Sequence, residues 1–99
     1  MPLTAAQKRH LRTLAQQLRP VVMVGQRGLG DSVVAELDGA LDAHELLKVK
    51  VAAGDREERA QLVETMADRT GAEVVQRIGH VAVLFRRNRK KPKVALPAG

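Results

Sequence analysis

The amino-acid sequence predicts a small α+β domain, an α/β sandwich in which helices cover a mixed four-stranded sheet. Apolar residues recur at helical spacing in three segments, and four shorter runs have the composition of strands. The predicted order is helix, strand, helix, strand, helix, strand, strand. Strand–helix–strand units indicate parallel strands joined by right-handed crossovers, whereas two adjacent final strands indicate an antiparallel pair.

The first predicted helix begins after Thr4, which forms a capping box with Gln7. Pro20 ends it, because the residue before a proline avoids the helical conformation. Its apolar stripe consists of Leu11, Leu14, Ala15 and Leu18. Beside that stripe the same helix carries four cations, Lys8, Arg9, Arg12 and Arg19.

The next segment is a strand and a second helix. Residues 21–24 form a continuous apolar run, which is typical of a buried strand, and Met23 is expected in the core together with Met66. A glycine-rich break follows over residues 25–30. Asp31 or Ser32 is expected to cap a helix that runs to about Ala43.

The remaining elements have equally local signals. Leu47, Val49 and Val51 alternate with Lys48 and Lys50, which predicts a half-buried strand with two lysines on its other face. Residues 55–70 form a third helix that Gly71 ends in the left-handed conformation. Strands over residues 73–78 and 81–87 flank a Gly-His turn and form a hairpin. The domain is expected to span residues 1–87, and residues 88–99 to form a basic, partly mobile tail.

The charges are segregated along the chain. Residues 1–30 carry +5 and residues 86–99 carry +6, neither with any acid, whereas residues 31–85 carry −5. Segregated positive charge favours a polyanionic partner, because each neutralised phosphate releases condensed counterions. The alternative is that these charges only keep the protein soluble, although a mixture of positive and negative charges would do so equally well.

The motif Gly25-Gln26-Arg27-Gly28 lies between a predicted strand and a helix start. Two glycines three residues apart allow the backbone to approach a ligand closely, and the helix N-terminus supplies free N–H groups for phosphate. RNA-binding modules of the KH class clamp the sugar–phosphate backbone with such a loop. In the alternative interpretation, the glycines only allow a strand to turn into a helix. The order of the glycines fits neither a dinucleotide-binding fingerprint nor a Walker A loop.

Four segments resemble the YhbY-like, or CRM (chloroplast RNA splicing and ribosome maturation), RNA-binding domains. They are LTAAQKRHLRTLAQQLRPVVMVGQRGL, HELLKVKV, GAEVVQRIGHVAVLFR and KVALP, in the order and spacing of the family. The resemblance implies a fold like the C-terminal domain of bacterial initiation factor three, preceded by an extra helix. It implies strand order 1-2-4-3, with the fourth strand antiparallel to the others. The stretch RRNRKKPK is more basic than is usual in the family.

The resemblance also implies a function and a partner. Stand-alone bacterial members are associated with precursors of the large ribosomal subunit, and plant relatives in longer chains serve in intron splicing. We therefore expect a cytoplasmic, monomeric protein that binds ribosomal RNA through phosphate contacts during large-subunit assembly. The residues expected to bind RNA are Lys8, Arg9, Arg12, Arg19, Gly25, Gln26, Arg27, Gly28, Lys48, Lys50, Arg86 and Arg87. For Lys48 and Lys50, a solvated strand face is an equal alternative.

Other functions have less support in the sequence. A protein-interaction module that docks a partner through the acidic middle segment is the alternative function. No nucleophile, base and orienting group can be assembled, so we expect no enzymatic activity, no cofactor and no small-molecule substrate. His10, His44 and His80 are far apart and predict no metal site. Cysteine is absent, and no apolar run is long enough to cross a bilayer, so we expect no disulfide and no membrane partner. With one aromatic residue, Phe85, bases cannot stack on the sheet as they do in RRM domains.

Overall fold

The computed structural model describes residues 2–52 and 54–98. The elements in chain order are α1 (Ala5–Ala15), β1 (Pro20–Val24), α2 (Asp31–His44), β2 (Leu46–Val51), α3 (Arg56–Thr70), β3 (Glu73–Ile78) and β4 (Val81–Phe85). The sheet order is β1-β2-β4-β3; β1 pairs parallel with β2, and β4 is antiparallel to both β2 and β3. The predicted fold class, element order and sheet order are therefore confirmed.

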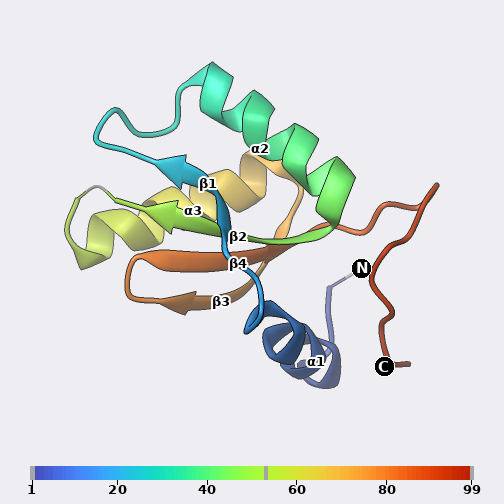
Figure 1. Cartoon of the computed structure of the whole chain (residues 1–99). Helices are drawn as coiled ribbons and strands as arrows, with labels where there is room; N and C mark the ends of the chain where they lie inside the picture. Colours follow the sequence, from blue (N-terminus) through green and yellow to red (C-terminus); the bar gives the residue numbers. More distant parts are fainter. Residues whose placement is uncertain (1, 53, 99) are drawn as a thin grey trace.

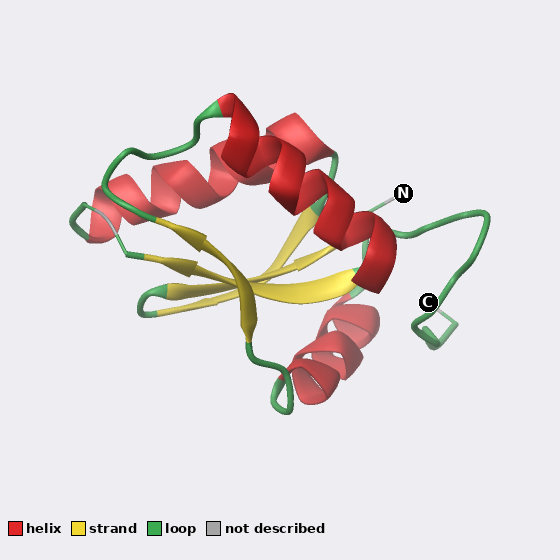
Figure 2. Cartoon of the chain, turned by 45° about the horizontal axis from the view of Figure 1, so that its top comes forward, coloured by secondary structure: helices red, strands yellow, loops and turns green. Residues whose placement is uncertain are grey.

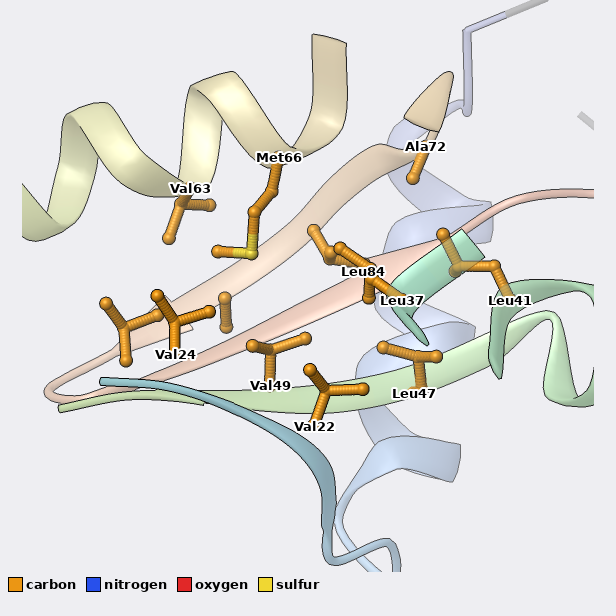
Figure 3. Packing of buried hydrophobic residues seen from close by; sticks show 12 residues of the cluster. Val22, Val24, Leu37, Leu41, Leu47, Val49, Val63, Met66, Ala72 and Leu84 are labelled. Carbon is orange, nitrogen blue, oxygen red and sulfur yellow. The ribbon is translucent and has the colours of Figure 1, made fainter. Parts of the chain in front are cut away.

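The two faces of the sheet are covered differently. Helices α2 and α3 lie together over one face, whereas α1 lies against the other (Figures 1 and 2). Alternate residues of each strand point to opposite faces, so β2 and β4 contribute to two separate clusters, whereas β1 contributes only to the larger one. The larger cluster lies beneath α2 and α3 (Figure 3) and contains Val22, Val24, Leu37, Leu41, Leu47, Val49, Val51, Val63, Met66, Ala72, Ala82 and Leu84. The smaller cluster lies beneath α1 and contains Leu11, Ala15, Leu46, Val75, Val83 and Phe85.

Several helix ends follow directly from local sequence. The Thr4 side chain accepts a hydrogen bond from the Gln7 N–H, and the Gln7 side chain accepts one from the Thr4 N–H, which completes the predicted capping box. Asp55 caps α3 by accepting a hydrogen bond from the Glu58 N–H. Gly71 ends α3 at φ 72°, in the left-handed region that favours glycine. These three predictions are confirmed.

The first helix is shorter than predicted. It ends at Ala15, after which the N–H groups of Gln16, Gln17 and Leu18 each donate to the carbonyl three residues earlier. Such bonds tighten the last turn and turn the chain away from the helix axis. Leu18 is consequently exposed and lies outside the core, and Arg19 is not on the helix. Leu14, within α1, is exposed as well.

Two further predictions are wrong. The N-cap of α2 is Gly30, which has no side chain to accept a hydrogen bond, and neither Asp31 nor Ser32 takes that position. Met23 is 62% exposed and is not in the core, although Met66 is fully buried. The reason is that β1 lies at the edge of the sheet, where α1 does not cover the face to which Val21 and Met23 belong.

The segment after β4 runs beside α1. Val94 and Leu96 pack against the smaller cluster, and the Gln7 side-chain amide donates to the Pro97 carbonyl at 3.0 Å. The ring Nε2 of His10 lies 3.0 Å from the Ala95 carbonyl oxygen. The mobility expected for residues 88–99 stays a prediction, and these contacts oppose it in the second half of the segment.

Candidate nucleic-acid interface

The loop that joins β1 to α2 is a closed turn. The Gly28 N–H donates to the Gly25 carbonyl at 3.0 Å, so Gln26 and Arg27 form an exposed tip. Gly28 has φ 71°, which a residue with a Cβ atom adopts only with strain. Gly25 does not have a positive φ, and a Cβ atom there would meet no atom within 4 Å. Gly28 is thus required by the turn itself, whereas the turn makes no such demand at Gly25.

The loop ends at the bare N-terminus of α2. Because Gly30 offers no side-chain acceptor, the first N–H groups of α2 stay available to an anion. Arg69 of α3 fixes this junction by donating to the Leu29 carbonyl at 3.3 Å and to the Asp31 carboxylate at 3.0 Å. On the α3 side, Glu58 lines a cavity of about 450 Å³ together with Gly28. The Glu58 carboxylate repels a phosphate that approaches the loop from the α3 side. A phosphate therefore approaches the loop more favourably at its exposed tip, Gln26 and Arg27.

The cations of α1 divide into two groups. Arg12 is half-buried and lines a groove together with Lys48 of β2, and Lys50, one position further along the same face of β2, is exposed. Lys8 and Arg9 lie nearer the start of α1. Arg19 precedes β1 at the end away from the loop, roughly 20 Å from Gly25 along an extended chain. The predicted residues therefore form a band across this side of the molecule, not one cluster.

Arg86 and Arg87 are engaged within the protein. The Arg86 guanidinium donates to the carboxylates of Asp38 and Asp42 on α2, and also to the carbonyls of Asp38 and Thr70. Arg87 lies over the Phe85 ring, 5.4 Å from its centroid, and pairs with the carboxylate of Glu45. These contacts join α2 and α3 to the end of β4, and they engage both Nη atoms of Arg86 and the Nη1 atom of Arg87.

Glu45 is a fully buried carboxylate at the end of α2. It has φ 62° and accepts hydrogen bonds from the backbone N–H groups of Asn88, Lys93 and Val94. Burial on its own raises the pKa of Glu45, but the three N–H donors and the Arg87 charge outweigh it and hold the pKa below its ordinary value. Glu45 therefore stays ionised at neutral pH and fixes the chain after β4.

This docking directs the chain after β4 back to α1. The Asn88 side chain donates to the Asp42 carbonyl near the end of α2, and residues 94–97 then return along α1 (Figure 1). Helix α2, on the opposite face, carries Asp31, Glu36, Asp38 and Asp42 and no Lys or Arg. Helix α3 is nearly neutral, because Arg56, Arg59 and Arg69 accompany its four acids. The basic helix α1 and the acidic helix α2 therefore lie on opposite faces of the sheet.

The sequence-based reasoning missed the exposed apolar residues on the α1 side of the sheet, Met23 and Ile78. It also missed the contacts of Val94 and Leu96, which the apolar pair within KVALP could have indicated. Within residues 2–52 and 54–98, no three His, Asp or Glu side chains are grouped as a metal site would require. None of the helices in those ranges has the length and apolarity needed to cross a membrane.

Comparisons with known proteins place the chain in a family. Residues 3–86 match the model of the CRS1 / YhbY (CRM) domain. The chain belongs to the CRM-domain family. A protein of Haemophilus influenzae named RNA-binding protein is 45% identical over 95 residues, which cover 96% of this chain and 95% of the relative. A Pseudomonas aeruginosa protein named as a probable RNA-binding protein is 39% identical over 93 residues, with 94% and 89% covered.

A solved structure agrees with this assignment. The solution structure of a hypothetical protein from Staphylococcus aureus, described as a candidate RNA-binding protein, matches with a TM-score of 0.84 at 33% identity. The match covers 97% of this chain and 100% of that protein. The CRM domain here thus has the fold of a relative that shares a third of its sequence.

Proposed function

We propose that this CRM-domain protein binds ribosomal RNA during assembly of the large ribosomal subunit. The turn of residues 25–28 and the cations of α1 and β2 contact the phosphate backbone. The observation that carries the proposal is a set of cations on the α1 side of the sheet, opposite the acidic helix α2. The set consists of Lys8, Arg9, Arg12, Lys48 and Lys50, and none of them belongs to an ion pair among the described residues. A polyanion is the partner that such a surface attracts.

The loop supports the same proposal. Arg27 is exposed at its tip, the N–H groups at the start of α2 have no side-chain cap, and Gly25 leaves its backbone open to close approach. The relatives named above as RNA-binding proteins are similar over nearly the whole chain. Arg86 and Arg87 are left out of the proposed contacts because acidic groups of α2 and Glu45 hold them. The alternative function, docking through the acidic segment, is weakened by that same use of Asp38 and Asp42.

The test compares Arg27→Ala and Gly25→Ala with the control Arg77→Ala. Arg77 is exposed on the α3 side of β3, so its removal changes the net charge equally but lies outside the proposed surface. Affinity for fragments of large-subunit precursor RNA is measured at several salt concentrations, with thermal melts of the same samples. Arg27→Ala should lower the slope of log affinity against log salt by about 0.7, and the control should not.

Gly25→Ala tests whether RNA approaches the backbone closely at this position, separately from any effect on folding. Its methyl group meets nothing in the protein, so the melting temperature should stay the same or rise slightly while affinity for RNA falls. If all three variants bind RNA as the wild type does, the loop is only a turn, and the proposed contact surface is wrong.

A further inference from the structure

Helix α1 leaves part of its own sheet face uncovered. Two rows of cross-strand neighbours lie toward the open end of this face. The first is Lys48–Val83–Gln76, whose Val83 belongs to the smaller cluster, and the second, beyond that cluster, is Met23–Lys50–Val81–Ile78. Met23 and Ile78 are each 62% exposed, and Val21 is 49% exposed. Met23 lies with Val21 on the β1 edge of the sheet, whereas Ile78 lies on the β3 edge beside Val81. Exposed apolar side chains that adjoin one another on a sheet indicate a surface that binds a partner.

A groove of about 250 Å³ runs where α1 meets this uncovered face. Val81, Val83 and Ile78 form its apolar floor, and Ala15 of α1 forms part of its wall. Two cations, Arg12 and Lys48, also line it, and no carboxylate of the described residues does. None of the four ion pairs among the described residues involves Arg12, Lys48 or Lys50. The groove therefore suits a ligand with an apolar body and a negative charge.

The position of the groove favours RNA over a protein partner. Met23 is two residues before Gly25, so the open face continues directly into the phosphate-binding loop at the end of β1. A strand that contacts Arg27 with one phosphate can reach Lys50 and then Lys48 with the phosphates that follow. Bases in a duplex are stacked and paired and cannot enter a groove, whereas unpaired bases can turn outward.

We propose that this groove takes an unpaired nucleotide of the bound RNA, with its base against Val81, Val83 and Ile78. Lys48, Lys50 and Arg12 contact the flanking phosphates. The base lies against aliphatic side chains because Phe85, the one aromatic residue, is buried beneath α1. This inference rests on the proposed function and adds to it a preference for single-stranded over double-stranded RNA.

The test uses the full chain with two probes, a short oligouridylate and the same strand annealed to oligoadenylate. The single strand should bind more tightly. Ile78→Ala should weaken its binding about three- to tenfold, near the lower end of the effect of removing a stacking side chain, and leave duplex binding unchanged. Leu14→Ala is the matched control, because Leu14 is another exposed apolar residue and does not line the groove. Lys48→Gln should lower the salt slope for the single strand by about 0.7.

Amide chemical shifts provide a second measurement that does not depend on a variant. Addition of oligouridylate should shift the signals of Lys50, Val81 and Ile78 in addition to those of the loop. If RNA binding depends on Arg27 but Ile78→Ala has no effect and these signals do not move, the groove inference is overturned and the proposed function stands. Equal affinity for duplex and single strand also overturns the groove inference. If neither probe nor precursor RNA binds, the proposed function fails as well.

Discussion

At the residue scale, Glu45 combines three unusual properties: complete burial, a positive φ and a carboxylate held by backbone donors. An ionised carboxylate without partners is costly to bury, and here three N–H groups and Arg87 supply them. A positive φ in a non-glycine residue marks local strain that the surrounding contacts must overcome. Glu45 is therefore the residue that connects the end of α2 to the chain after β4.

The pH dependence of stability should report on Glu45. Its pKa in the folded protein lies below the ordinary value of 4.5, so its contribution is present above that pH and is lost as the pH falls through the folded value. Glu45→Gln should lower the free energy of unfolding at neutral pH by about 1 to 3 kcal/mol and flatten its dependence on pH below 4.5. Denaturant melts across this range measure both effects. Glu36→Gln, an exposed residue of α2, is the control; an equal effect of both substitutions would contradict the assignment.

At the scale of elements, the chain after β4 acts as a clamp although it contains no helix or strand between residues 88 and 98. It contributes Val94 and Leu96 to the smaller cluster and carries four exposed cations, Arg89, Lys90, Lys91 and Lys93. One segment thus contributes both to the stability of the fold and to the positive charge of the protein. The two contributions can be measured separately with different variants.

Removal of residues 88–99 should leave unfolding cooperative, because the larger cluster beneath α2 and α3 is unaffected. The free energy of unfolding should nevertheless fall by about 2 to 4 kcal/mol, since buried Glu45 loses three donors. A full-length variant with Arg89, Lys90, Lys91 and Lys93 replaced by Gln should keep its stability. If all four cations contact single-stranded RNA, its salt slope should fall by about 2.8. Two outcomes would contradict this separation of stability from charge: a loss of stability in the variant with the four Gln substitutions, or no loss of stability in the truncated protein.

At the scale of the whole molecule, the sheet separates a basic side from an acidic one. The charge of +6 is a small net value that conceals this asymmetry. A polarised molecule is attracted to RNA in one orientation, with α1, the open sheet face and the loop toward the phosphates and with α2 and α3 directed outward. The outward helices are then free of RNA while the protein is bound.

An assembly factor should accompany precursors of the large subunit more than mature ribosomes. Sucrose gradients of a cell lysate, probed for the protein, should show it with the precursor particles. Arg27→Ala should move part of it to the top of the gradient, where free protein is found, and Arg77→Ala should not. Equal or greater abundance on translating polysomes would argue against a role in assembly.

The sequence by itself determined the elements, their order and several of their ends. The Thr4–Gln7 capping box, the Asp55 cap and the Gly71 terminus are decided by interactions within a few residues, so the local sequence is sufficient to predict them. The turn of residues 25–28 was likewise apparent from its glycines. The sheet order was predicted from the family resemblance, which carries tertiary information that the periodicity does not.

Only the tertiary structure decided which residues are covered. Met23 is an apolar residue within an apolar run, so the sequence predicts that it is buried. It is nevertheless exposed, because a helix of eleven residues covers only part of the sheet face. Arg86 and Arg87 belong to a basic run in the sequence, yet partners more than 40 residues away hold them. The segment after β4 is held beside the end of α2 because the buried Glu45 carboxylate accepts hydrogen bonds from its backbone. Burial and pairing depend on elements that are distant in the chain, and no local pattern records them.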